Sequence, residues 1–141
     1  PHSISPSESN ILLIASFTYV DFITIVFLLA HLVTTPVESR EKTVTIIENV
    51  VYLELLRRKS RVNSGKVAAK EVDFVAVDMN EVEYYQVCAS VLDEKTLARE
   101  LAPLREIKDN YPKTLLTLDD IGNGANYEGI KQINVIDWLL A

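Results

Sequence analysis

Side chains with chemistry of their own are few in this sequence. Cys88 is the only cysteine, which excludes an intrachain disulfide and a cysteine-based zinc cluster within the chain. A thiol nucleophile needs a nearby base, but both histidines, His2 and His31, lie in the N-terminal block without the context of a catalytic triad. Cys88 is therefore interpreted as a small buried strand residue. A lone cysteine is typical of a reducing, cytoplasmic setting.

Two segments that contain glycine are candidates for ligand loops. Gly65–Lys70 reads GKVAAK, but it lacks the preceding glycine spacing and the hydroxyl after the lysine that a phosphate-binding loop needs. The segment from Asp119 and Asp120 to Gly129 carries acids without the ligand spacing of a calcium loop, so a surface turn is expected there. We therefore expect no ATP to bind to this chain and no resident cofactor.

The charge balance argues against a general attraction to nucleic acid. The chain has 14 basic and 20 acidic residues and a formal net charge of -6, so any contact with phosphate backbones would have to be local. One basic cluster follows a helical pattern, and its members are Arg57, Arg58, Lys59, Arg61, Lys66 and Lys70. Solvation of a helix C-terminus is the favoured interpretation of this cluster, with a phosphate site as the alternative.

Two acids stand in segments with clear periodicity. Glu48 lies within residues 43–59, where a wide apolar stripe at helical spacing predicts a helix packed against a sheet. The stripe consists of Ile47, Val50, Val51, Leu53, Leu55 and Leu56. Asp73 lies within Glu71–Val77, whose alternation predicts a strand. The strand pattern places Val72, Phe74 and Ala76 on one face and Asp73, Val75 and Val77 on the other.

Further elements follow from the same patterns. Residues 61–67 suit a hairpin or an edge strand, and a turn at 78–80 leads into a second strand, Val82–Ser90, on which Gln86 and Cys88 share one face. Asp93 is expected to cap a helix that runs to about Asp109, with a kink or restart near Ala102 because of Pro103. Strands are predicted at Thr114–Leu118 and Ile130–Ile136, after which Asp137 caps a short tail.

The N-terminal block is unusually apolar. Ile11–Val33 contains one charged residue, Asp21, and is long enough to cross a bilayer as a helix. Asp21 near its middle and the lack of a flanking basic cluster favour a buried or interfacial segment, with a strand at 17–22 and a helix after it, while a membrane segment stays the alternative. The sequence therefore divides into a hydrophobic segment with its linker, residues 1–40, and a domain of residues 41–141.

The domain resembles the C-terminal domain of an uncharacterised bacterial and archaeal AAA+ ATPase family, which has a PD-(D/E)xK nuclease-like fold. Four segments in the same order carry the resemblance, which covers about 95 of 141 residues: Ile46–Arg58, Gly65–Val77, Glu83–Asp120 and Gly129–Leu140. It implies a restriction-endonuclease-like core of the α/β (α+β) class, with a helix, antiparallel hairpin strands, a helix and a strand, in which helices flank a mixed sheet.

The resemblance also implies where a nuclease site would lie. Such a site uses a helix acid, a strand acid and an E-x-K on the next strand, because acids bind Mg²⁺ or Mn²⁺ and the lysine orients or activates the attacking water. The corresponding positions are Glu48, Asp73, Gln86 and Cys88. Glu48 and Asp73 match as catalytic and metal-binding candidates, but Gln86 and Cys88 remove the third acid and the lysine, so the site is expected to be degenerate and inactive.

Three hypotheses follow. The first is a non-catalytic nuclease-like accessory domain of an ATPase that binds a protein partner or associates with itself. The second is a divalent-metal-dependent nuclease that works with Glu48 and Asp73. The third is a domain tethered to a membrane by Ile11–Val33.

Overall fold

The computed structural model describes residues 23, 24, 26, 27, 40–59, 61–67 and 70–141. The chain divides into two compact units, Pro1–Pro36 and Val37–Ala141. The four described residues of the first unit are helical, and they fall within the stretch that was expected to be a helix. The strand expected at residues 17–22 lies outside the described residues.

Among the helices of the described residues, none has the length and apolar character that a membrane crossing requires. Most of Ile11–Val33, on which the membrane hypothesis depends, lies outside the described residues.

The first described element of the second unit is a long helix, α2 (Arg40–Arg58). Its buried residues recur at intervals of three and four and include Ile47, Val50, Val51, Glu54 and Leu55. The expected stripe was too wide, because Leu53 and Leu56 are 54% and 44% exposed. The position toward the core is instead taken by the acid Glu54, which is 1% exposed.

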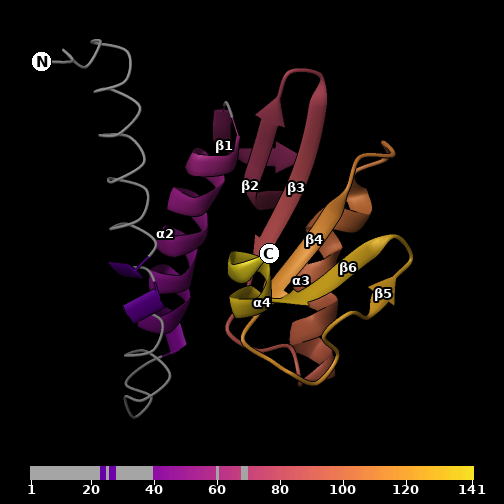
Figure 1. The fold of residues 1–141 in the computed structure, drawn as a ribbon. Helices are drawn as coiled ribbons and strands as arrows, with labels where there is room; N and C mark the ends of the chain where they lie inside the picture. The colour runs from indigo at the N-terminus through magenta and orange to yellow at the C-terminus, as the bar shows by residue number, and fades with distance from the viewer. Residues whose placement is uncertain (1–22, 25, 28–39, 60, 68–69) are drawn as a thin grey trace, which may run out of the picture. The chain divides into compact units, whose positions relative to one another are not determined.

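Six strands form one mixed sheet in the order β1-β2-β3-β4-β6-β5 (Figure 1). Their bounds are Arg61–Val67 (β1), Lys70–Asp78 (β2), Glu81–Val87 (β3), Lys113–Thr117 (β4), Asn126–Tyr127 (β5) and Ile130–Asn134 (β6). Strands β1 to β3 are antiparallel, β3, β4 and β6 are parallel, and β5 is antiparallel to β6. A parallel neighbour needs a crossover, which α3 (Glu94–Glu106) supplies between β3 and β4. The predicted class, a mixed sheet flanked by helices, is confirmed.

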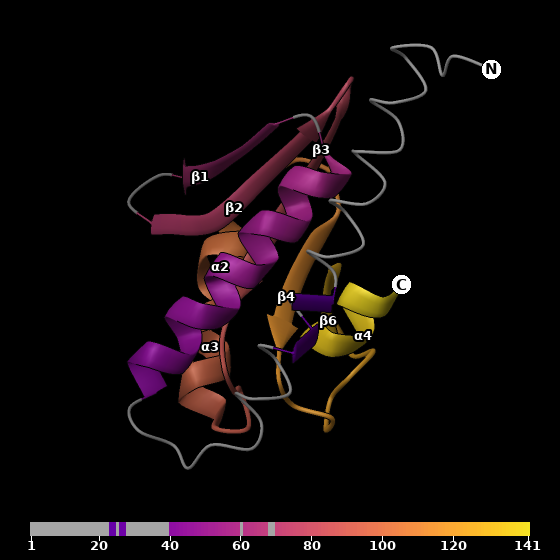
Figure 2. The same ribbon diagram turned by 60° about the vertical axis from the view of Figure 1, so that its left-hand side comes forward.

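Helices lie on both faces of this sheet (Figures 1 and 2). Phe74 of β2 stacks on an aromatic ring of α2, and its cross-strand partner Tyr85 contacts Trp138 of α4 (Val135–Leu140), with ring centroids 5.6 Å apart. Gln86, the next residue of β3, points to the other face, where its amide donates to Glu100 of α3. The sheet therefore separates α2 and α4 from α3.

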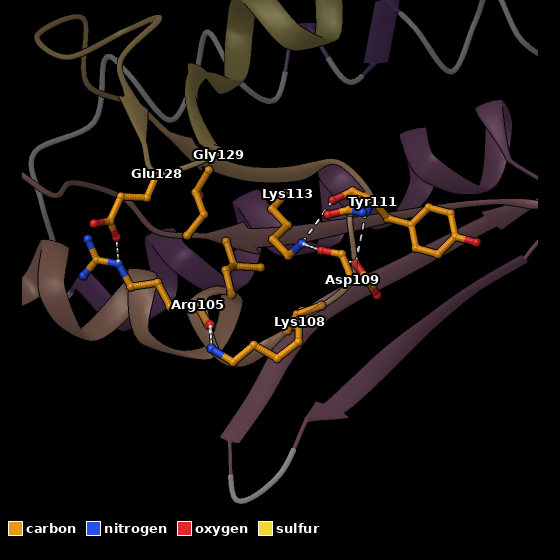
Figure 3. A pocket seen from close by; sticks show the side chains of 11 residues that line it. Arg105, Lys108, Asp109, Tyr111, Lys113, Glu128 and Gly129 are labelled. Atoms are coloured by element: carbon orange, nitrogen blue, oxygen red, sulfur yellow. Dashed lines mark hydrogen bonds and ion pairs between the residues drawn. The ribbon is translucent and has the colours of Figure 1, made fainter.

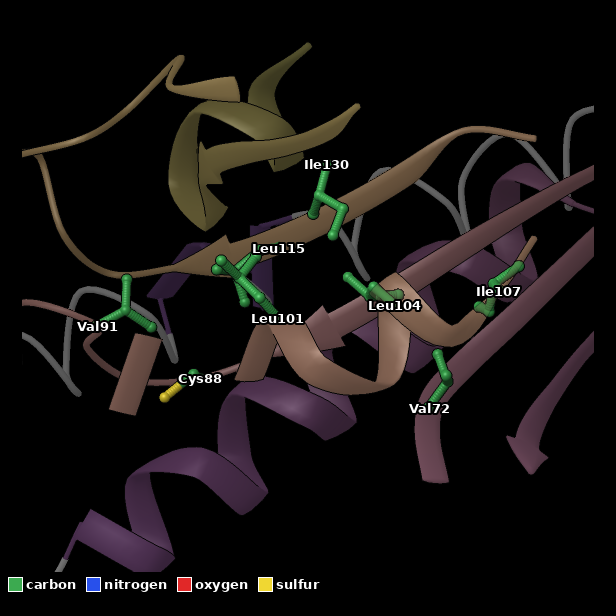
Figure 4. Close-up of a cluster of buried hydrophobic side chains, with 8 residues drawn as sticks. All are labelled: Val72, Cys88, Val91, Leu101, Leu104, Ile107, Leu115 and Ile130. Carbon is green, nitrogen blue, oxygen red and sulfur yellow. The ribbon is translucent and has the colours of Figure 1, made fainter. Parts of the chain in front are cut away.

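The core beneath α3 is a cluster of buried apolar side chains (Figure 4). Its members are Val72, Cys88, Val91, Leu101, Leu104, Ile107, Leu115 and Ile130. Cys88 is thus buried as predicted, but it lies just beyond the end of β3 (Glu81–Val87) and not within the strand. Val72 belongs to this cluster whereas Phe74 faces α2, so the prediction that the two share a face is wrong.

Helix α3 begins where the sequence predicts and ends earlier than expected. The side chain of Asp93 caps α3 as predicted, accepting from the N–H of Thr96 at 2.9 Å. Helix α3 ends at Glu106 and continues through Pro103 without a restart. Pro103 removes one hydrogen bond near the C-terminal end of the helix, and its ring is buried in return.

Two strands are shorter than expected. Strand β3 ends at Val87 instead of Ser90, and β6 ends at Asn134 instead of Ile136. Asn134, and not Asp137, caps α4, because its Oδ1 accepts from the N–H of Ile136 at 2.9 Å.

Candidate functional site

Three elements bring the predicted site residues together. Glu48 lies near the middle of α2, Asp73 lies on β2, and Gln86 lies on the neighbouring strand β3. Glu48 and Asp73 line the same hollow of about 210 Å³, and Asp73 and Gln86 are joined by a hydrogen bond. The structure thus places Glu48 near Asp73, and Asp73 beside Gln86.

A β-bulge in β2 sets the position of Asp73. Asn63 of β1 pairs with Val75 and Gly65 pairs with Val72, so two steps on β1 oppose three on β2. The extra residue reverses the alternation between Val72 and Phe74, which explains why they face opposite sides of the sheet.

At the bulge the side chain of Asp73 substitutes for backbone pairing. Regular pairing of β2 with β3 begins at Phe74 and Tyr85. Before that point the N–H of Val87 donates to Asp73 Oδ2 at 2.7 Å, and the N–H of Asp73 donates to Gln86 Oε1 at 3.4 Å. The candidate acid is therefore also part of the strand pairing.

Glu100 of α3 is a fourth member of the site that the sequence analysis missed. Its Oε2 accepts from Gln86 Nε2 at 3.1 Å, and its Oε1 accepts from Nε and Nη2 of Arg99 at 3.1 and 2.9 Å. The signal was present, because Glu100 lies three residues after Leu97 and four before Leu104, on the stripe of α3 that faces the sheet.

The acids of the site disfavour one another's charge. Burial is the main cause that raises the pKa of Asp73 to about 6, against the lowering effect of the Val87 N–H. The charges of Glu48, Glu100 and Glu71 raise that pKa further. Burial and then the charge of Glu100 raise the pKa of Glu48. Opposite charge or protonation would relieve this repulsion.

Glu48 also lines a second, larger hollow. This space of about 520 Å³ lies between the N-terminal part of α2 and the segment that leads from β3 into α3. Cys88, Ser90, Thr96 and Arg99 contribute to its lining. Glu48 thus stands where two hollows meet, beside the acids of β2 and α3.

A divalent metal needs several oxygen ligands that converge on one point. In the described part of the chain, no group of three Asp, Glu, His or Cys side chains could hold a metal ion. Both oxygens of Glu100 already accept from Gln86 and Arg99, and Oδ2 of Asp73 accepts from Val87. Glu48 and Asp73, the two candidate ligands, therefore have no third ligand residue beside them in the described part of the chain.

Cys88 has neither the exposure nor the surroundings of a nucleophile. It is 7% exposed, and its Sγ lies 3.3 Å from the carbonyl oxygen of Ser90. Burial raises the pKa of its thiol, which keeps it protonated.

The basic cluster at the end of α2 is engaged within the domain. Arg57 and Arg58 both donate to Glu54, and Arg58 also donates to the carbonyl of Trp138 at 2.9 Å. Lys59 pairs with Glu83 at 3.1 Å. Arg57 to Lys59 are thus held in ion pairs within the domain, which differs from the solvated helix end that was expected and argues against a phosphate site at these residues.

The segment GKVAAK does not form a phosphate loop, because Gly65 and Lys66 lie in strand β1. Gly65 is required by packing, since a Cβ atom there would come within 2.4 Å of Val75 Cγ2.

A third hollow, of about 460 Å³, lies near the C-terminal end of α3 (Figure 3). Lys113 donates to Asp109 Oδ1 at 3.3 Å and Arg105 lies 3.5 Å from Glu128, so each acid at its rim has a cation beside it. Lys108 donates to the carbonyl of Arg105 at the end of the helix. This arrangement stabilises the loop without presenting an evident reactive group.

Comparison with known proteins gives one informative match. No protein-family model matches the chain, and no solved structure matches it significantly. An uncharacterized protein of Haemophilus influenzae is 44% identical over 99 residues, which cover 67% of this chain and 22% of that protein. The chain therefore spans less than a quarter of the relative's length, and it is similar to one part of a longer bacterial protein.

Proposed function

We propose that residues 41–141 form a cytoplasmic, non-catalytic nuclease-like module that serves as an accessory or regulatory domain of a AAA+ type ATPase. The resemblance of four segments to such a domain supports this proposal, and so does similarity to a small part of a longer protein. The module acts by binding a protein partner or a second copy of itself.

The observation that carries the proposal is the state of the two altered positions. Gln86 stands where the nuclease resemblance expects an acid, so it offers no anionic oxygen to a metal ion. Its amide instead donates a hydrogen bond to Glu100. Cys88, in place of the lysine, is packed in the apolar core with a protonated thiol. The pair that would bind metal and activate water therefore contributes to packing and hydrogen bonding instead.

The exposed side of α2 supplies a surface for association. Tyr52, Leu53 and Leu56 are 39%, 54% and 44% exposed, and their spacing places them side by side on the helix. Adjacent exposed apolar residues on an otherwise acidic chain favour a contact surface for another protein.

A nuclease assay tests the lack of catalysis. The full chain should not cleave linear or circular DNA, or RNA, at millimolar Mg²⁺ or Mn²⁺ above the background of Asp73→Asn. The variant is a matched control, because asparagine keeps an oxygen for the N–H of Val87 and removes only the charge. Cleavage that needs metal and disappears in Asp73→Asn would replace this proposal with the nuclease alternative.

The alternative, a divalent-metal-dependent nuclease with a degenerate site, is favoured by the placement of Glu48, Asp73 and Gln86. These residues come from three elements: Glu48 and Asp73 line one hollow, and Gln86 is hydrogen-bonded to Asp73. Under this alternative Mg²⁺ or Mn²⁺ would bind to Glu48 and Asp73. The tether by Ile11–Val33 stays a third hypothesis, which detergent-free purification of the full chain as a monomer would contradict.

A further inference from the structure

Building on the proposed loss of catalysis, we infer that Arg99 is a built-in counter-ion that, together with the amide of Gln86, occupies the carboxylate a metal ion would otherwise use. Donors of the protein itself engage the Glu100 carboxylate, and substituting those donors should create a metal site that the parent lacks.

Both carboxylate oxygens of Glu100 accept hydrogen bonds within the protein. This side chain is only 12% exposed and faces the sheet from α3. Gln86 takes one of its oxygens and Arg99 takes the other with two N–H groups. Arg99 engages both lone pairs of Oε1 and Gln86 engages one of those of Oε2, so a cation could reach Glu100 only through the remaining lone pair of Oε2, against the positive charge of Arg99.

Arg99 pairs with Glu100, the residue that follows it on α3. Neighbouring residues on a helix normally point in different directions, so the pairing with Glu100 requires the long side chain of Arg99 to bend back toward the site. Arg99 also lines the hollow that Glu48 and Cys88 line. Its charge lowers the pKa of Cys88, the position of the missing lysine, against the larger effect of burial. A cation from α3 thus acts on the place where the nuclease resemblance expects a cation from β3.

The donors to Glu100 are an amide, from Gln86, and a guanidinium, from Arg99. A guanidinium stays protonated in proteins, so Arg99 neutralises Glu100 but cannot accept a proton from water as a lysine amine can. The connected bonds from Arg99 through Glu100 and Gln86 to Asp73 join α3, β3 and β2. Glu100 is the one acid that gives its carboxylate to this network, because Asp73 takes part through its backbone N–H, so the network withholds Glu100 from a metal ion.

The test is a gain of Mn²⁺ binding. Arg99→Gln frees one oxygen of Glu100, and the double variant Gln86→Glu/Arg99→Gln adds a third carboxylate beside Glu48 and Asp73. Mn²⁺ titration by calorimetry, with paramagnetic broadening of backbone NMR signals near Val87 to locate the ion, should give the affinity order double variant, Arg99→Gln, parent. The double variant should bind at least about tenfold more tightly than the parent, the scale that ligand-orienting residues usually control.

A second double variant, Asn126→Asp/Lys131→Gln, makes the same charge changes at exposed positions of β5 and β6 away from the site and should show no gain. Site-specific binding by the parent as tight as that of the double variant would overturn the inference, and so would a folded double variant that does not bind. If the double variant does not fold, Arg99→Gln decides, since this side chain is 73% exposed. Metal binding by the parent without cleavage sinks only the inference, whereas metal-dependent cleavage sinks the proposed function as well.

Discussion

Asp73 combines two roles that usually belong to different groups. Its carboxylate accepts the N–H of Val87, which the bulge leaves without a regular backbone partner, and it carries a charge among other acids. The hydrogen bond favours the ionised form while burial and the neighbouring charges disfavour it. Burial has the larger effect, so the folded protein holds a proton on Asp73 more strongly than the unfolded chain does.

This imbalance predicts a dependence of stability on pH. The pKa of Asp73 rises from 3.8 to about 6 on folding, so the stabilisation from its proton is complete below the lower value and is lost as the pH rises through the upper one. Asp73→Asn has no charge to lose. Its unfolding free energy should therefore exceed that of the parent at neutral pH by at most about 3 kcal/mol, with the difference closing near pH 4.

Urea unfolding followed by the fluorescence of Trp138, the only tryptophan, measures this difference at each pH. Glu81→Gln is the control, because it removes a charge from an exposed acid at the start of β3. A difference between Asp73→Asn and the parent that stays constant from about pH 4 to 7 would contradict the prediction.

The sequence predicted part of this site for identifiable reasons. Glu48, Asp73 and Gln86 could be brought together because helical and alternating patterns fix the elements that carry them, and the resemblance fixes the order of those elements. Glu100 was missed because its neighbours Leu97 and Leu101 dominate the pattern of α3. The bulge at Asp73 is a tertiary feature, since it depends on the register with β1 and leaves no local signal.

At the scale of elements, buried charge joins the two ends of the domain. Glu54 lies on the inner stripe of α2, where periodicity alone predicts an apolar residue. Arg58 lies between Glu54 and α4, with its guanidinium 4.6 Å from the ring centre of Trp138 and bonded to that residue's carbonyl. The elements were predictable from periodicity, but this link was not, because it depends on residues 80 positions apart.

Arg58→Met should therefore cost more stability than Arg57→Met. Both substitutions remove one arginine from Glu54, but only Arg58 also holds α4 through Trp138. We expect losses of about 2–4 kcal/mol for Arg58→Met and about 1 kcal/mol for Arg57→Met, whose side chain is 44% exposed. Urea unfolding followed by far-ultraviolet circular dichroism measures both losses, and equal losses would show that α4 gains nothing from Arg58.

At the scale of the whole molecule, the net charge and the exposed apolar residues of α2 have opposite effects on self-association. A net charge of -6 disfavours close approach of two copies, whereas the apolar side of α2 favours it. The chain corresponds to less than a quarter of the length of its Haemophilus influenzae relative. Apolar contact is short-ranged and charge repulsion is screened by salt, so the two effects can be separated.

Self-association through α2 should consequently strengthen with salt. We expect the full chain to exceed the monomer mass of 15.9 kDa in sedimentation equilibrium, more so at high ionic strength, where screening removes the repulsion. Leu53→Glu/Leu56→Glu should return the mass toward that of the monomer, because each new charge would have to be buried in the contact. Leu92→Glu, at an exposed residue outside α2, should have no such effect. If both variants associate like the parent, the copies meet through another surface, and α2 is left for a different protein.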